Sequence, residues 1–273
     1  MGGSIHPSAI IDPAAELAVE VEVGPQAVIG AGVVVGEGCR IDAGAQLRGP
    51  LELGQGNRVY AQACLGFDPQ DLKYAGEPTR LIIGARNVFR ESCTVHRGTG
   101  KGGGVTRIGD ENLFMVYSHV AHDCLVGNRT IFSNGGTLAG HVRVDDDAVI
   151  GAYSAVHQFC RVGRHAYIGG YSVITQDALP YAKTVGHKPA FYGLNRIGLE
   201  RKGFVPEAVA RLDRALRILV RSALTTPRAL DRLRAELGGH PEVDYLIEFV
   251  ATSERGVIKT LPGRRGSRGG GGD

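Results

Sequence analysis

Apolar residues recur at every sixth position along most of the chain. The series starts at Ile5, is interrupted after Gln70 and again at 100–107, and ends at Ile174. The fifth residue of each six-residue unit is usually small, and four of the five cysteines occupy that position. We interpret these cysteines as packing residues, because buried thiols are usually inert.

A period of six matches neither the turn of an α-helix nor the two-residue alternation of a simple strand. It fits a short strand followed by a turn. Three such units close a triangular coil of about 18 residues, and coils of this kind stack into a parallel β-helix. The two interruptions, 71–82 and 100–107, cannot continue the wall of such a column. We predict that they loop out of it, either as functional excursions or as tolerated surface insertions.

A helical period replaces this pattern from Pro206 onward. Thr226 is the predicted N-cap of a second helix that ends at Gly238–Gly239, and 242–253 is predicted to be a third. The polar side of the first helix carries four arginines: Arg211, Arg214, Arg217 and Arg221. This basic helix face is a candidate docking surface for an acidic partner, unless it is simply a solvated face.

These patterns predict two domains and a tail. Residues 1–190 are expected to form an all-β column of hexapeptide repeats, and 191–260 a small C-terminal α-helical domain. The Gly- and Arg-rich segment 261–273 is expected to be disordered.

Composition and charge narrow the class of protein. Glycine supplies 41 of the 273 residues but shows no Gly-X-Y period, which excludes collagen. The 31 basic and 28 acidic residues give a net charge of +3, which does not suggest a nucleic-acid binder. We find no signal peptide, no integral membrane segment and no CxxC pair, so we expect a cytoplasmic protein with reduced thiols.

Four of the nine histidines are candidates for chemistry: His119, His122, His141 and His157. Residues one coil apart lie above one another in the column, so the last three are expected near one edge of it. The ordinary pKa of histidine suits proton transfer, which makes His122 a candidate general base, with Asp123 orienting its ring if the chain bends there. From spacing alone, two alternatives stay open: a zinc site of His122, His141 and His157, or a merely polar edge.

Five sequence blocks resemble the UDP-N-acetylglucosamine O-acyltransferases, a family of hexapeptide-repeat enzymes. The blocks are Gln70–Thr79, Glu91–Gly98, His119–Cys124, Leu138–His141 and Ala155–Cys160. The similarity is near-continuous from about residue 60 to Phe204. It implies that the column is a left-handed parallel β-helix and that the protein is a homotrimer with its grooves between neighbouring subunits.

The resemblance also implies a reaction. An (R)-3-hydroxyacyl chain would pass from acyl carrier protein to the 3-hydroxyl of UDP-N-acetylglucosamine, the first step of lipid A biosynthesis, without a cofactor. His122 would be the general base, and the backbone N–H of Gly140 would stabilise the oxyanion. Gly170 would end the acyl groove, with Tyr167 near enough to intrude. The implied substrate-binding residues are Gln70, Asp71, Lys73, His119, His141, His157, Gln158, Asn195 and Arg201.

The chain departs from the family pattern at Ile197, where the family usually has glutamate. Some members of the family prefer a 3-amino sugar, so this acceptor stays open. So do two other kinds of protein: a metal-dependent lyase that resembles carbonic anhydrase trimers, and a catalytically silent scaffold.

Overall fold

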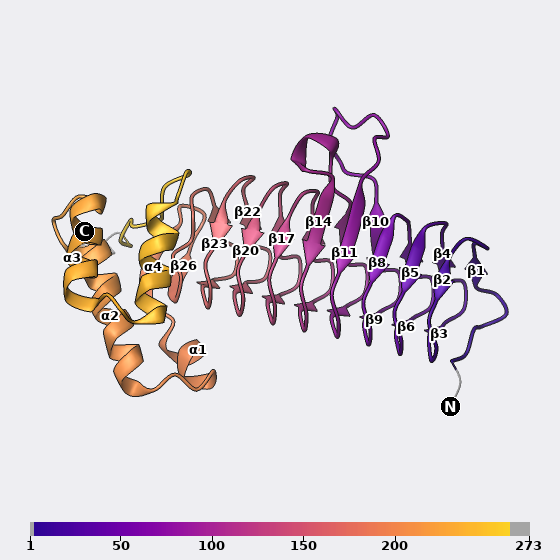
Figure 1. The fold of residues 1–273 in the computed structure, drawn as a ribbon, viewed down its shortest axis with the longest axis horizontal. Coiled ribbons are helices and arrows are strands. Elements are labelled where there is room, and N and C mark those ends of the chain that lie inside the picture. Colours follow the sequence, from indigo (N-terminus) through magenta and orange to yellow (C-terminus); the bar gives the residue numbers. More distant parts are fainter. Residues whose placement is uncertain (1–2, 263–273) are drawn as a thin grey trace, which may run out of the picture.

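The computed structural model describes residues 3–262, and most of them form a column of stacked coils that is longer than it is wide (Figure 1). Each coil contributes one short strand to each of three sheets, so neighbours within a sheet are parallel and three strands apart in sequence, except at the C-terminal end. Strand pairs such as His119↔Thr137 and Val120↔Leu138 show the register, in which each residue pairs with its equivalent in the next coil. The predicted parallel β-helix is therefore confirmed.

We name the three sheets face A, face B and face C. Face A contains β3 (Glu22–Val23), β6 (Arg40–Ile41), β9 (Arg58–Val59), β12 (Val88–Phe89), β15 (Leu113–Phe114), β18 (Ile131–Phe132), β21 (Val149–Ile150), β24 (Tyr167–Ile168), β26 (Ala182–Val185) and β27 (Ala190–Leu194). Face B contains β1 (Ile10–Ile11), β4 (Val28–Ile29), β7 (Gln46–Leu47), β10 (Cys64–Phe67), β13 (Thr94–His96), β16 (His119–Val120), β19 (Thr137–Leu138), β22 (Ala155–Val156) and β25 (Val173–Ile174). Face C contains β2 (Glu16–Leu17), β5 (Val33–Val35), β8 (Leu51–Leu53), β11 (Arg80–Ile83), β14 (Val105–Ile108), β17 (Leu125–Val126), β20 (Arg143–Val144) and β23 (Arg161–Val162). At the C-terminal end of face A, β26 pairs with β24 and, antiparallel, with β27.

The first residue of each six-residue unit fills the interior, as the period predicts. Phe89, Phe114 and Phe132 stack there with ring centroids 4.9 and 4.7 Å apart. Ile5 is the exception, with 56% of its surface exposed, because it lies in the first coil of the column. Stability therefore depends on stacking, since each coil buries its interior only against its neighbours.

Two excursions leave the column side by side (Figure 1). The first spans 68–79, between β10 and β11, and the second spans 97–104, between β13 and β14, with a 3-10 turn at Gly100–Gly102. The predicted limits, 71–82 and 100–107, were therefore about three residues late. The reason is that β11 and β14 pair with each other over four residues, from Arg80↔Val105 to Ile83↔Ile108.

The C-terminal helices cover one end of the column (Figure 1). They are α1 (Arg196–Arg201), α2 (Pro206–Arg221), α3 (Thr226–Leu237) and α4 (Pro241–Ala251). The three predicted helices are confirmed, whereas α1 was missed because six residues are too few to show a period. Thr226 is not the N-cap of α3: Thr225 holds that position, and Thr226 is the first helical residue.

Three of the four arginines of the α2 face are already paired. Arg211 contacts Glu242 at 2.9 Å, Arg217 contacts Asp213 at 2.8 Å, and Arg214 pairs with Glu236. These ion pairs reduce the net positive charge of the α2 face, which was named as a candidate docking surface in the sequence analysis.

The segment 261–273 lies outside the described residues apart from 261–262. Over the described part of the chain, no helix is both long and apolar enough to cross a membrane.

Candidate active site

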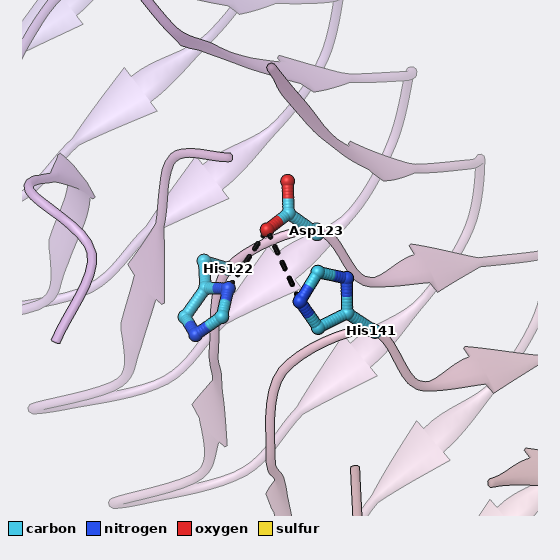
Figure 2. A group of neighbouring side chains, drawn as sticks. All are labelled: His122, Asp123 and His141. Carbon is cyan, nitrogen blue, oxygen red and sulfur yellow. Dashed lines mark hydrogen bonds and ion pairs between the residues drawn. The ribbon is translucent and has the colours of Figure 1, made fainter. Parts of the chain in front are cut away.

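The turn from face B to face C, which we call the BC corner, brings His122 and Asp123 together. Asp123 follows β16 with a left-handed φ of 59°, which aspartate tolerates better than most residues. This is the bend that the sequence left open. It allows adjacent side chains to meet, and His122 Nδ1 lies 2.8 Å from Asp123 Oδ2 (Figure 2).

The Asp123 carboxylate is almost completely buried and held on several sides. It accepts hydrogen bonds from the backbone N–H and the hydroxyl of Thr99, at 2.8 and 2.7 Å. Its own N–H donates to Thr106 Oγ1 at 2.8 Å. The second excursion covers it so closely that a Cβ on Gly102 would lie 2.0 Å from Asp123 Cγ. The carboxylate is therefore fixed, and it accepts the Nδ1 proton of His122.

The lone pair of His122 is then on Nε2, the ring nitrogen that does not face Asp123. Gly140 lies one coil above, where a Cβ would be 2.4 Å from His122 Cε1 and 2.7 Å from Nε2. Glycine is required here by space, since any side chain would push the imidazole away. Within residues 3–262, the Gly140 N–H donates to no protein acceptor. A donor next to the free nitrogen of a base suits a reaction that creates an oxyanion.

His141 lies above Asp123, because the two occupy equivalent positions in successive coils. Its Nε2 is 3.7 Å from Asp123 Oδ2, and its ring stands at 87° to that of His122 with centroids 5.1 Å apart (Figure 2). Phe159, at the same position one coil further on, stacks on the other side at 4.6 Å. Burial lowers the pKa of His141 despite the opposing carboxylates of Asp123 and Asp71. His141 is therefore a neutral imidazole near pH 7.

Two further histidines lie on face B, His119 in the same coil as His122 and His96 one coil lower. His119 Nδ1 lies 2.7 Å from Thr94 Oγ1, and the His96 ring meets the His119 ring edge-on at 4.9 Å. Burial is the main cause that lowers the pKa of both, and His122 adds repulsion. The pKa of His96 falls to about 4. His96 Nδ1 has no hydrogen-bond partner among the described residues.

His157 does not join the set that a zinc site would need. It is exposed one coil higher, where its Nδ1 contacts the Gln158 carbonyl oxygen at 3.2 Å and Arg255 Nη2 at 3.3 Å. The potential ligand atoms that lie within 4.8 Å of one another belong instead to His122, Asp123 and His141. The three-histidine zinc interpretation was therefore wrong about its third ligand, because residue 157 stacks above Ala139 rather than above His122.

The first excursion carries Gln70, Asp71 and Lys73. Asp71 Oδ1 accepts a hydrogen bond from the Lys73 N–H at 2.9 Å. The negative charge of Asp71 also acts on His141, where it favours the protonated form and so raises the pKa. Gln70 and Lys73 are exposed. The excursion is anchored by the buried Arg97, which pairs with Asp68 and donates to the Tyr74 hydroxyl at 3.0 Å.

The two excursions also hold each other. Glu77 Oε1 accepts from the Gly100 N–H at 3.1 Å. The segment that carries Asp71 is thus tied to the segment that buries Asp123.

Asn195 and Arg201 lie elsewhere, at the turn from face C to face A, which we call the CA corner. Asn195 caps α1, accepting from the Gly198 N–H at 3.3 Å and donating to the His165 carbonyl at 3.0 Å. A cavity of about 580 Å³ opens beside it, lined by Arg201, Tyr167 and the departure residue Ile197. The two corners are separated by the width of face C, so one chain does not bring these residues to His122.

The CA corner is strongly basic. Asp147 is the one acidic residue among the lining residues, and it contacts Lys202 at 2.6 Å and Arg129 at 3.0 Å. Burial opposes its ionisation, but hydrogen bonds from Arg129 and Lys202 outweigh burial and keep the pKa of Asp147 low. The other cations that line the cavity are Lys183, Arg196 and Arg201. Such a cavity favours an anionic ligand.

Gly170 lies at the turn from face A to face B. A Cβ at Gly170 would meet only the backbone of Ala152, whose carbonyl oxygen would lie 3.3 Å away. Tyr167 is 39% exposed on face A and lines the basic cavity. Their effect on acyl length stays a prediction.

Sequence reasoning missed Thr99, Thr106 and Phe159. Phe159 follows His141 by one full coil, so the register could have found it. Thr99 precedes an interruption of the period, and no spacing predicts where such an excursion folds back.

Comparison with known proteins decides the family. The chain matches the model of UDP-N-acetylglucosamine O-acyltransferase domain 2 over 177–258 and that of the bacterial transferase hexapeptide over 141–176. It is 48% identical to the acyl-[acyl-carrier-protein]–UDP-N-acetylglucosamine O-acyltransferase of Thiobacillus denitrificans, with 94% of this chain and 99% of that protein aligned. The Myxococcus xanthus enzyme of the same name is 49% identical over 93% of this chain and 99% of its own length. The chain therefore belongs to this acyltransferase family.

Solved structures of the family agree. The Acinetobacter baumannii protein superposes with a TM-score of 0.91 at 40% identity, covering 93% of this chain and 99% of that one. The Francisella novicida UDP-N-acetylglucosamine acyltransferase gives 0.91 at 33% identity, with 93% and 94% covered. The expected left-handed β-helix followed by C-terminal helices is thereby confirmed.

Substituting Gly140 by alanine should lower kcat by about a hundredfold without unfolding the protein. The added methyl group would displace the His122 ring, and a misplacement of about 1 Å can cost about a hundredfold in rate. The measurement is kcat together with the thermal midpoint. Gly30→Ala is the matched control, because a Cβ there would lie 3.4 Å from its nearest neighbour, the Leu47 carbonyl oxygen, and it should keep kcat near the wild-type value. Equal loss in both variants would contradict the steric argument.

Replacing His96 by asparagine should flatten the acid side of the stability profile. Its pKa is lowered to about 4, so between about pH 6.5 and 4 the unfolded chain binds a proton that the folded chain does not. Wild-type stability therefore decreases as pH falls through this window. Thermal midpoints from pH 7 to pH 4.5 would show the smaller decrease in the variant. The exposed His187→Asn should keep the wild-type slope, and a variant slope like that of wild type would refute the assignment.

Proposed function

We propose that this protein transfers an (R)-3-hydroxyacyl chain from acyl carrier protein to the 3-hydroxyl of UDP-N-acetylglucosamine. The name of its relatives, acyl-[acyl-carrier-protein]–UDP-N-acetylglucosamine O-acyltransferase, supports the donor and the acceptor. The observation that carries the mechanism is the fixed His122–Asp123 pair, whose free Nε2 lies against Gly140. A sugar hydroxyl is a weak nucleophile, and a neutral imidazole next to a buried carboxylate suits removal of its proton.

In the proposed step, the hydroxyl oxygen attacks the thioester carbonyl carbon as His122 Nε2 takes its proton. Charge develops on the carbonyl oxygen, and the Gly140 N–H is the donor we assign to it. The carbon–sulfur bond then breaks, and the imidazolium returns the proton to the departing thiolate. Asp123 stabilises the imidazolium between these events.

A covalent acyl-enzyme is not needed. The thiol that follows the His122–Asp123 pair belongs to Cys124, and burial raises its pKa to about 12, so it is not a thiolate at neutral pH. All five cysteines are free, and we propose that the protein works in the cytoplasm.

We propose that the basic CA corner binds the diphosphate of the sugar nucleotide. Phosphate oxygens pair well with guanidinium and ammonium groups such as Arg201 and Lys202. Ile197 has no polar side-chain atom and cannot hydrogen-bond to the nucleotide. In this proposal, neighbouring residues such as Arg201 and Lys202 recognise it.

The separation of the two corners supports a shared site and, with the resemblance, a homotrimer. Asp123 and Arg129 lie in one coil, at opposite ends of the β17 strand, so the base and the basic cavity have the same height on the column. A neighbouring copy that presents its CA corner to the BC corner would complete the site. We assign carrier-protein docking to the α2 face, where the acidic carrier competes with the internal ion pairs of Arg211 and Arg214.

The first test is acyl transfer from (R)-3-hydroxyacyl carrier proteins of graded chain length to UDP-N-acetylglucosamine and to its 3-amino analogue. Wild type should turn over, and His122→Ala should lose activity on the order of a hundredfold or more. The exposed His187→Ala is the control and should stay active. Absence of turnover with both acceptors would sink the proposal, and the preferred donor measures the effect of Gly170 and Tyr167.

Mixing two inactive variants tests the shared site. His122→Ala has an intact CA corner, and Arg201→Ala has an intact BC corner. Co-expressed, they should recover about a quarter of wild-type activity, because about a quarter of randomly formed interfaces pair two intact corners. If co-expression gives no more than the sum of the separate variants, each chain holds a whole site.

A further inference from the structure

The side chains around the base also form a set of potential metal ligands. His122 Nδ1, Asp123 Oδ2 and His141 Nε2 lie within 4.8 Å of one another (Figure 2). Over residues 3–262, no other group of three such side chains is this close. Two imidazole nitrogens and one carboxylate oxygen are a ligand set that Zn²⁺ binds well, and they leave a fourth position open.

The separations between these atoms suit a tetrahedral ion. Ligand atoms that each lie about 2.1 Å from zinc are about 3.4 Å from one another. Asp123 Oδ2 is 2.8 Å from His122 Nδ1 and 3.7 Å from His141 Nε2, so the observed separations lie on either side of that value. The ring shifts that zinc requires are therefore about half an ångström.

The surroundings of Asp123 hold the carboxylate as a metal site requires. The hydroxyl of Thr99 donates to Oδ2 at 2.7 Å, and the Thr99 N–H donates to Oδ1 at 2.8 Å. These bonds keep the carboxylate oriented when its contact with the His122 proton is replaced by a metal ion. The contact with His141 is too long for a hydrogen bond, so zinc breaks none there.

The site is open on the histidine side only. The side chain of Asp123 is 1% exposed, whereas those of His122 and His141 are 15% and 25% exposed. Gly102 of the second excursion covers the carboxylate on another side. A hydrated ion therefore meets the two imidazoles first and loses its water as it reaches the carboxylate.

Zinc at this place changes the tautomer of His122. The ion takes the lone pair of Nδ1, and the proton of the neutral ring moves from Nδ1 to Nε2. Nε2 then has no lone pair with which to accept the proton of a sugar hydroxyl. The charge of the ion also disfavours a second proton on the ring. The base is therefore inactive for as long as the ion is bound.

We propose that His122, Asp123 and His141 form a reversible inhibitory site for Zn²⁺. The inhibitory role rests on the proposed function, because it requires His122 to be the base. Mg²⁺ and Ca²⁺ prefer a larger number of oxygen ligands, so they should neither bind at this site nor inhibit.

Calorimetric titration of the metal-free chain, without a histidine tag, measures the site directly. Zinc chloride should bind at about one ion per chain, and turnover should fall in proportion to the occupied fraction and return with EDTA. Magnesium chloride at the same concentration should do neither. Zinc that binds without any loss of turnover would overturn the proposal.

Two histidine variants test the ligand set. His141→Asn removes one ligand and keeps the His122–Asp123 pair, so it should raise the Kd for zinc by about tenfold or more. Its residual turnover should become less sensitive to zinc by a similar factor. His157→Asn is the same replacement one coil higher and should keep the wild-type Kd. Equal Kd values for the two variants would place zinc elsewhere, and thermal midpoints without metal check that both are folded.

The outcomes separate this inference from the proposed function. If wild type turns over but binds no zinc, the inference fails and the proposed function stands. If zinc binds through His141 but the metal-free protein acylates neither acceptor, the proposed function fails and the metal site stands without its inhibitory role. If turnover requires added zinc, the inhibitory assignment is wrong.

Discussion

The closed triangular coil is the constraint on which the rest of the structure depends. Once one coil closes, every residue has a fixed neighbour in the next coil, and that neighbour cannot shift without breaking the parallel pairing of all three faces. The register therefore places Gly140 above His122 and His141 above Asp123. On this scaffold, the residue that lies above a given side chain is found by counting 18 residues along the chain. The count holds wherever no excursion lengthens the coil.

The two excursions supply what the repeat cannot. A bare column exposes its corners to water, and a carboxylate at such a corner would be a weak partner for an imidazole. The 97–104 excursion buries Asp123 under Thr99 and Gly102, and the 68–79 excursion adds Asp71 nearby. Arg97 connects the first excursion to the carbonyl oxygens of Gly49 and Gly66 in the column, and Glu77 connects the two excursions to each other. The excursions thus turn a repetitive surface into a local low-dielectric site.

Most of the fold could be predicted from the sequence, because a strict period leaves one way to bury its apolar residues. The limits of the excursions could not, since β11 and β14 extend beyond the six-residue unit where they pair. The histidines could be assigned to one edge, but His141 follows His122 by slightly more than one coil. In the sequence analysis this 19-residue spacing was treated as one coil. It therefore did not show that His141 lies above Asp123 and not above His122. The zinc alternative included His157 for the same reason. Thr99 could not be predicted, because no sequence period shows where the excursion after it folds back.

The three corners of the same column carry three different kinds of chemistry, although their backbones are alike. Left-handed turn positions hold Asp123 and His141 at one corner, Arg129 and Asp147 at the second and Tyr153 at the third. Because the backbone geometry is common, the side chains alone make one corner a buried His–Asp pair, the second a basic cavity and the third a row of exposed tyrosines. The triangular column separates the first two corners by the width of a sheet, which is why the proposed reaction needs a second copy to bring them together.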